Sequence, residues 1–256
     1  MLYEEDFLKQ TKETFDQQVI TITGTIDVLK TVTSVYENLF TNLIHTATET
    51  GTCYDLIRKA KRNIALIKEI QGQPYISGTT TILRWRGVCE LVSYLETFLH
   101  DIFCHLAEKN SNDFVKALAE KGKDLKIPRE FLVEQGIQNL EQHLGQLVMD
   151  TANNKINFQD LQSTKREFET YFNLKIDSKV EKEEQEDIIL MQAIRHIITH
   201  KNGVVDKKFT DQIRNTKNER DYQINDTILV DDLMLKHFME TTTNLTNTVL
   251  SLIRNN

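Results

Sequence analysis

The sequence has few of the residues that interrupt helices. It contains only 2 prolines and 9 glycines among 256 residues. Proline lacks a backbone donor, and glycine costs about 1 kcal/mol in a helix interior relative to alanine. A chain with so few of either can form long, unbroken helices. Composition therefore favours an all-α fold, and the length suffices for one large helical domain or two small ones.

Cysteine is scarce as well. The three cysteines, Cys53, Cys89 and Cys104, lie far apart, and no Cys-x-x-Cys pair occurs. That spacing argues against a disulfide framework and against a structural zinc site. We therefore expect three reduced thiols.

Long apolar runs are also missing. No stretch approaches the ~20 apolar residues that a membrane span needs, and the first residues are acidic where a signal peptide would be basic. We therefore expect a cytoplasmic protein without a membrane partner. Its net charge of −7 offers no global attraction to nucleic acid. Any nucleic-acid site must consequently be local.

Apolar residues recur at helical spacing through most of the chain. We predict one long or one broken helix over residues 3–48. Further helices are predicted over residues 55–70, 83–107, 110–120, 130–152, 159–172, 183–201 and 231–254. The 83–107 segment is apolar on more than one face, which is typical of a central core helix.

Two features organise the remainder of the chain. Residues 72–79 predict a loop, so we divide the chain into an N-terminal helical region, residues 1–79, and a helical domain, residues 80–256. Residues 222–230 alternate in polarity around Asn225 and Asp226, which fits either a small β-hairpin or an extended arm.

The most chemically suggestive stretch runs from Arg195 to His200. It lies in the last turns of a predicted helix that Gly203 is expected to end. His196 and His200 are four residues apart and share a face, whereas Arg195 and His200 are separated by about 140° around an ideal helix. A compact site from these side chains would form more readily if two copies of the helix met across a two-fold axis.

The chain around this stretch is basic although the whole is acidic. Between residues 195 and 220, seven basic residues stand against three acidic ones. This local excess of positive charge suggests a site for an anion. A solvated loop and helix face is the plainer interpretation of the same charges.

The Arg195-to-His200 stretch resembles the signature of the HEPN superfamily, close to the branch of RiboL-PSP-HEPN proteins. Arg195 matches the motif arginine, His196 the polar position after it, and His200 the motif histidine. The segment from Gly203 to Phe209 and a closing helix after Asp231 also fit. Residues 86–96 resemble the earlier core helix of that domain, so the resemblance covers residues 80–256.

The resemblance implies a HEPN-type helical bundle and a homodimeric, metal-independent endoribonuclease without a cofactor. Its catalytic residues would be Arg195, His196 and His200. Residues that would contact the RNA are Lys201, Asn202, Lys207 and Lys208. Because similar proteins are often toxins or antiviral defence effectors, an antitoxin or a defence-system protein is a further expected partner.

The chemistry of these residue types agrees with that implication. RNA cleavage without a metal needs a base for the 2′-hydroxyl proton, an acid for the 5′-oxygen and positive charge on the phosphate. A histidine with an ordinary pKa near ~6.5 can serve as base or acid at neutral pH. Arginine supplies a fixed bidentate contact to phosphate.

Other interpretations stay open. A histidine in a last helical turn also complements the helix dipole, and a nearby arginine is often a surface ion-pair partner. The chain would then be a non-catalytic dimerisation, nucleotide-binding or protein-binding module. His100 and Cys104 share a helical face, but only two ligands converge there, so packing is the better interpretation than a metal site. Glu96 could orient a motif side chain across the bundle.

Overall fold

The computed structural model describes residues 2–49, 74–122, 127–134, 136, 139–150 and 157–255. These residues form an all-α helical bundle, and none of them belongs to a regular strand. The all-α prediction is confirmed. The helix predicted at residues 55–70 and the thiol of Cys53 lie outside the described residues.

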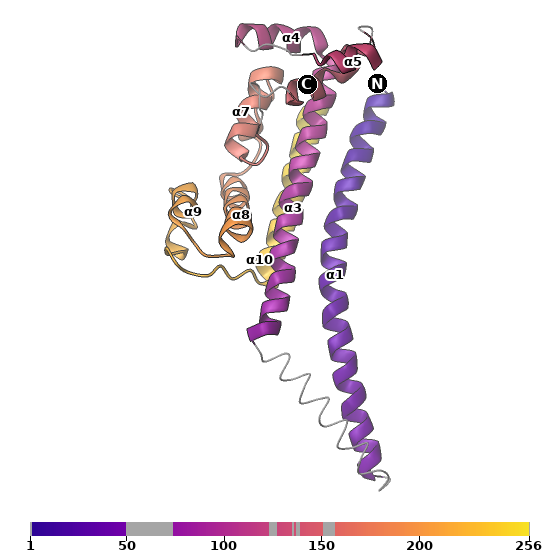
Figure 1. Ribbon diagram of the computed structural model, residues 1–256, viewed down its shortest axis with the longest axis vertical. Coiled ribbons are helices and arrows are strands. Elements are labelled where there is room, and N and C mark those ends of the chain that lie inside the picture. Colours follow the sequence, from indigo (N-terminus) through magenta and orange to yellow (C-terminus); the bar gives the residue numbers. More distant parts are fainter. Residues whose placement is uncertain are drawn as a thin grey trace.

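Two long helices form the spine of the molecule. Helix α1 (Leu2–Glu49) and helix α3 (Pro74–Lys109) run side by side, with α10 (Asp232–Arg254) behind α3 in Figure 1. The sequence predicted either one long or one broken N-terminal helix, and the structure has one long helix. The predicted loop at residues 72–79 is wrong from Pro74 onward, because proline is compatible with a first helical turn, where its missing N–H is not needed.

Helix α3 is the central core helix, as its apolar faces predicted. It contacts α1, α4 (Ser111–Glu120), α6 (Leu144–Asp150), α8 (Lys182–Lys201) and α10. Its buried side chains include Val88, Leu91, Val92, Leu95, Phe98, Leu99, Ile102 and Phe103. Burying a side chain of this size contributes about 1.5–3 kcal/mol, so α3 holds the other helices in place.

The remaining helices are short and lie around this spine. They are α5 (Arg129–Glu134), α7 (Leu161–Phe172), α9 (Lys207–Gln212) and the 3₁₀ turns η2 (Glu141–His143), η4 (Ile176–Ser178) and η5 (Glu219–Asp221). The continuous helix predicted over residues 130–152 is therefore wrong. Gly136 lies between its two parts with a φ of 75°, outside the helical region.

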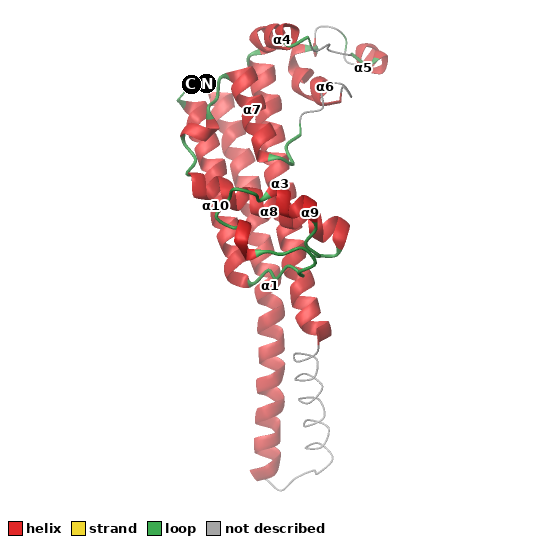
Figure 2. Ribbon diagram, turned by 90° about the vertical axis from the view of Figure 1, so that its left-hand side faces the viewer, coloured by secondary structure: helices red, strands yellow, loops and turns green. Residues whose placement is uncertain are grey.

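Helix α1 extends past the other described helices, and both chain termini lie at the opposite end of the bundle (Figure 2). Val35 and Leu39 on the extending part of α1 are exposed. Despite their length, none of the helices in the described ranges is apolar enough to cross a membrane.

The segment before α10 is an extended arm, one of the two alternatives for residues 222–230. It lies along the residues that follow α8, where Val204 and Thr227 form an isolated antiparallel bridge. The Ile228 N–H donates to the Gly203 carbonyl at 2.8 Å. The arm thus pairs with the residues after α8, while one backbone hydrogen bond, from the Asp226 N–H to the Gln223 carbonyl at 3.1 Å, forms a turn within it.

Candidate functional site

Helix α8 carries the Arg195-to-His200 stretch in its last two turns. It ends where Asn202 adopts the left-handed conformation, with a φ of 54°. Gly203 follows with a φ of 76°, and its N–H donates to the Ile197 carbonyl at 3.0 Å. This hydrogen bond is typical of a helix C-terminus. The predicted helix end is confirmed, although Asn202 takes the first left-handed position.

Trp85 of α3 packs directly against Gly203. A Cβ atom at residue 203 would lie 2.4 Å from two carbons of the indole ring. Two independent features therefore require glycine at residue 203. The positive φ disfavours any side chain, and the indole leaves no room for a Cβ atom. The contact fixes the histidine-bearing end of α8 against α3.

A pocket of about 490 Å³ opens beside Arg195 and His196. Four elements supply its walls: α3, the loop before α7, α8 and α9. The lining residues are Val92, Glu96, Asn157, Gln159, Asp160, Gln192, Arg195, His196, Lys208, Asp211 and Gln212. Helix α8 contributes Gln192, Arg195 and His196 because residues three and four apart share a helical face.

The structure brings some of the predicted site residues together and leaves others apart. Arg195, His196 and Lys208 line the pocket. The ring of His200 lies outside it, with its centroid 4.8 Å from that of His196. The exposed residues Lys201, Asn202 and Lys207 also lie outside the lining.

His196 has a lowered pKa. Its partial burial is the main cause, and the positive charges of Lys208 and His200 act in the same direction. Asp206 opposes them. The shift favours the neutral imidazole near neutral pH, and a neutral imidazole can accept a proton.

Glu96 faces the same pocket from α3. Burial raises the pKa of its carboxyl group, while the charge of Arg195 and the neighbouring Gln159 lower it. Its Oε1 atom is buried and accepts no hydrogen bond from the described residues. Glu96 does interact electrostatically with Arg195 across the α3–α8 contact. The sequence suggested only that Glu96 could orient a motif side chain across the bundle, and its place in the pocket wall follows from how α3 packs against α8.

Cys89 lies on α3 about two helical turns before Glu96. Burial raises the pKa of its thiol, although the Thr199 hydroxyl group and the Arg195 charge oppose the shift. Cys89 and Cys104 are free thiols. A raised thiol pKa disfavours the reactive thiolate.

The histidines of α3 lie in other contacts. His100 Nδ1 is 3.1 Å from Asp101 Oδ1, and Cys104 Sγ is 3.8 Å from His100 Nε2. His105 stacks on Phe7 with ring centroids 4.3 Å apart. Hydrogen bonding to Asp101, then to Cys104, raises the pKa of His100 to about 10. Within the described part of the chain, no three potential ligands gather for a metal ion.

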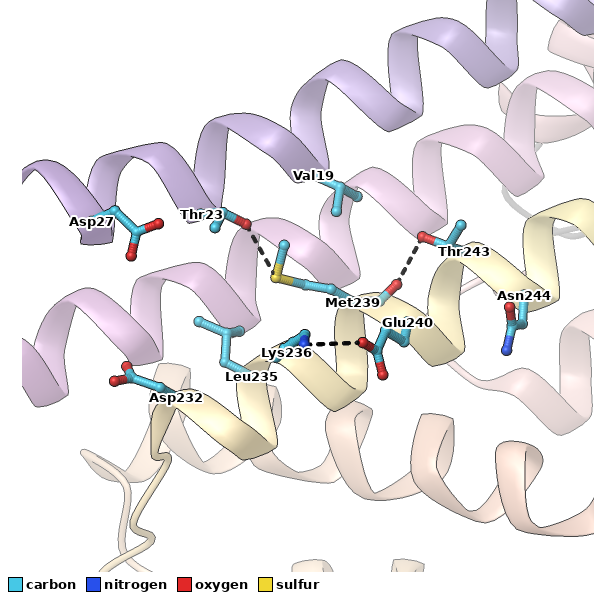
Figure 3. A pocket seen from close by; sticks show the side chains of 10 residues that line it. All are labelled: Val19, Thr23, Asp27, Asp232, Leu235, Lys236, Met239, Glu240, Thr243 and Asn244. Atoms are coloured by element: carbon cyan, nitrogen blue, oxygen red, sulfur yellow. Dashed lines mark hydrogen bonds and ion pairs between the residues drawn. The ribbon is translucent and has the colours of Figure 1, made fainter.

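A second hollow lies between α1 and α10 (Figure 3). Its lining includes three carboxylates, Asp27, Asp232 and Glu240, and one cation, Lys236. The Lys236 Nζ atom lies 3.7 Å from Glu240 Oε1, so its charge is already offset. This groove therefore repels phosphate, whereas the pocket beside Arg195 offers cations for it.

In comparisons with known proteins, no family model, no curated protein and no solved structure matches the chain.

Proposed function

We propose that this chain is a metal-independent endoribonuclease of the HEPN type, with its active site beside Arg195, His196 and His200. The observation that carries the proposal is the pocket in which Arg195, His196 and Lys208 converge. The Arg195 guanidinium interacts electrostatically with Glu96 in this pocket, and Lys208 supplies a second cation to the same lining. In this proposal both cations contact a phosphate group of RNA.

His196 is the base in this proposal because its lowered pKa keeps it neutral. It takes the proton of the 2′-hydroxyl group, and the 2′-oxygen then attacks phosphorus. The bond from phosphorus to the 5′-oxygen breaks, and a histidine supplies the proton to that oxygen. The products are a 2′,3′-cyclic phosphate and a 5′-hydroxyl group, with no metal in any step.

His200 is the acid in this proposal, and it comes from a second copy of the chain. Attacking and leaving oxygens lie on opposite sides of phosphorus in an in-line displacement. His196 and His200 of one copy are neighbours on one side of α8, with ring centroids 4.8 Å apart. A homodimer that pairs two α8 helices places a second His200 across the cleft.

The exposed residues Lys201, Asn202 and Lys207 extend the proposed RNA contact beyond the pocket. Such an enzyme would act in the cytoplasm as a toxin or an antiviral defence effector. An antitoxin or another defence-system protein would then control it.

One observation favours a second candidate, a non-catalytic module that binds a nucleotide or a protein. The pocket is lined by Glu96, Asp160 and Asp211 as well as by its cations. Such a mixed lining suits recognition of a ligand as well as cleavage. Binding of RNA without any cleavage under the conditions below would favour this candidate.

The test is cleavage of a mixed cellular RNA pool in the presence of EDTA. We expect His200→Ala to lose about 100-fold or more of the activity, and Arg195→Ala to be comparably inactive. Arg195→Lys should retain a fraction, because a point charge replaces the bidentate fork. His143→Ala and Arg86→Ala, outside the pocket, are the matched controls.

Thermal melting of each variant separates lost chemistry from lost folding. His200 is exposed in a last helical turn, where charge effects are worth about 0.3–1 kcal/mol. If His200→Ala cleaves as well as the parent protein, or if EDTA stops cleavage and a divalent metal restores it, the proposal is wrong.

A further inference from the structure

The pocket beside Arg195 also contains polar side chains that have no role in the proposed cleavage of the phosphate. Four carboxamide residues line it: Asn157, Gln159, Gln192 and Gln212. Carboxamides carry a donor and an acceptor side by side, which is the pattern of nucleobase edges. The volume of about 490 Å³ falls within the range of roughly 300–1,000 Å³ of small-ligand sites. A single nucleotide therefore suits this pocket.

Gln192 is held in one orientation. Its side chain is 5% exposed, and its Oε1 atom accepts a hydrogen bond from the Leu161 N–H at 3.2 Å. Gln192 also lines the pocket, and because its oxygen is already used at the start of α7, the group it has left to offer a ligand is its Nε2 donor.

Glu96 supplies the complementary acceptor. The other two carboxylates of the lining are engaged: Asp160 caps α7 by accepting the Gln162 N–H, and Asp211 pairs with Arg214. The Glu96 carboxyl group interacts with Arg195 and Gln159, but its buried Oε1 atom has no donor among the described residues. A buried acceptor without a donor is unfavourable, so a ligand with N–H groups would stabilise this arrangement.

We propose that this pocket binds a guanine base of the RNA, with Glu96 accepting from the N1–H and N2–H groups and Gln192 donating to O6. Guanine is the RNA base that offers two adjacent N–H donors and a neighbouring carbonyl on one edge. Adenine places its N1 acceptor toward the carboxylate, which repels it. Uracil offers a single N–H between two carbonyl groups, and cytosine offers an amine beside an acceptor.

The inference rests on the proposed function for its substrate, RNA, and places the scissile phosphate against the pocket's cations. A base in the pocket and a phosphate at Arg195 belong to the same nucleotide. The enzyme therefore cleaves on the 3′ side of guanosine. The matching small probe is guanosine 3′-monophosphate, whose phosphate is attached where the scissile one would be.

The test is calorimetric titration of the full chain with the four nucleoside 3′-monophosphates in EDTA. We expect the guanosine nucleotide to bind about tenfold more tightly than the adenosine one. Glu96→Gln should reverse this preference, because the new amide donor meets the N1–H of guanine but pairs with the N1 acceptor of adenine. The control is Glu108→Gln, which neutralises another half-buried carboxyl group of α3 outside the pocket.

Three results would overturn the inference: equal affinity for the four nucleotides, no binding at millimolar concentration, or an unchanged preference in Glu96→Gln. Melting curves show whether that isosteric variant is folded. Guanosine-selective binding without RNA cleavage would support this pocket and refute the nuclease proposal. Cleavage of RNA without any base preference would support the nuclease proposal and refute the guanine pocket.

Discussion

The rings of His196 and His200 lie side by side, with centroids 4.8 Å apart and planes tilted by 51°. Both project from one side of α8, one helical turn apart. His196 reaches the pocket and His200 lies beyond it. Two histidines placed in this way cannot flank one phosphorus atom from opposite sides.

The proposed division of roles between two copies predicts complementation. His196→Ala retains the acid and His200→Ala retains the base, so each alone should be inactive. A re-equilibrated mixture should recover about one quarter of the parent activity, because half the dimers are mixed and each has one intact site. Mixing each variant with itself is the control. An inactive mixture, or a monomer by light scattering at micromolar concentration, would refute the shared site.

The pH dependence of cleavage should report the environment of His196. A base with a lowered pKa stays deprotonated to lower pH, so the acid limb of kcat/KM should fall below pH 6.5. Lys208→Ala removes a positive charge beside the imidazole and should move that limb upward. Lys179→Ala, at an exposed lysine outside the pocket, should leave it in place. A limb that does not move in Lys208→Ala would contradict this assignment.

Three glycine-to-alanine variants separate the causes that fix residue 203. Gly203→Ala meets both a positive φ and the Trp85 indole, so we expect a loss of about 2–4 kcal/mol in the free energy of unfolding. Gly122→Ala has a φ of 63° but open space around it, and should lose about 1 kcal/mol. Gly24→Ala in α1 also has open space and should gain about 0.5–1 kcal/mol. Urea unfolding measures all three, and equal losses at residues 203 and 122 would exclude a role for the indole.

His100 should make stability depend on alkaline pH. Its hydrogen bond to Asp101 raises the pKa to about 10 in the folded protein, above the value of 6.5 expected for the unfolded chain. The contribution is therefore fully present below pH 6.5 and is lost as pH rises through about 10. Because both side chains are partly exposed, we expect about 0.5–1 kcal/mol.

Urea unfolding at pH 6 and pH 10 tests this contribution. Asp101→Asn should reduce the difference between the two pH values, whereas Asp113→Asn, in an exposed pair with Lys116, should not. An identical pH dependence in Asp101→Asn and the parent protein would show that the His100 pKa is not raised by this carboxylate.

Much of the helical framework could be predicted from local sequence. Apolar periodicity located α1, α3 and α8, and the side chain of Asp231 caps α10 as expected, by accepting the Met234 N–H at 2.7 Å. These features depend on neighbours within one or two turns. Local errors arose where a residue type is compatible with two backbone conformations. Proline fits both a loop and the first turn of a helix, and Pro74 begins a helix.

The pocket could be predicted only in part, because most of its walls come from distant parts of the chain. The α8 residues share a face by spacing alone, and this much was evident from the sequence. The approach of Glu96, of the loop at residues 157–160 and of Gln212 depends on packing of α3, α7 and α9 against α8. No periodicity in the sequence encodes those contacts. The separation of Arg195 and His200 around α8, by contrast, could be predicted from helical spacing alone.

The pairing of the arm with the residues after α8 also determines which backbone amides are exposed together to solvent. The Val205 N–H donates to the Asp226 carbonyl at 2.8 Å, and the Asn225 N–H donates to the Val205 carbonyl at 2.9 Å. These amides can exchange their hydrogens with solvent only when the arm detaches, and the same event exposes the Gly203 carbonyl. We therefore expect residues 203–205, which follow α8, and residues 225–228 of the arm to open together as one local unit.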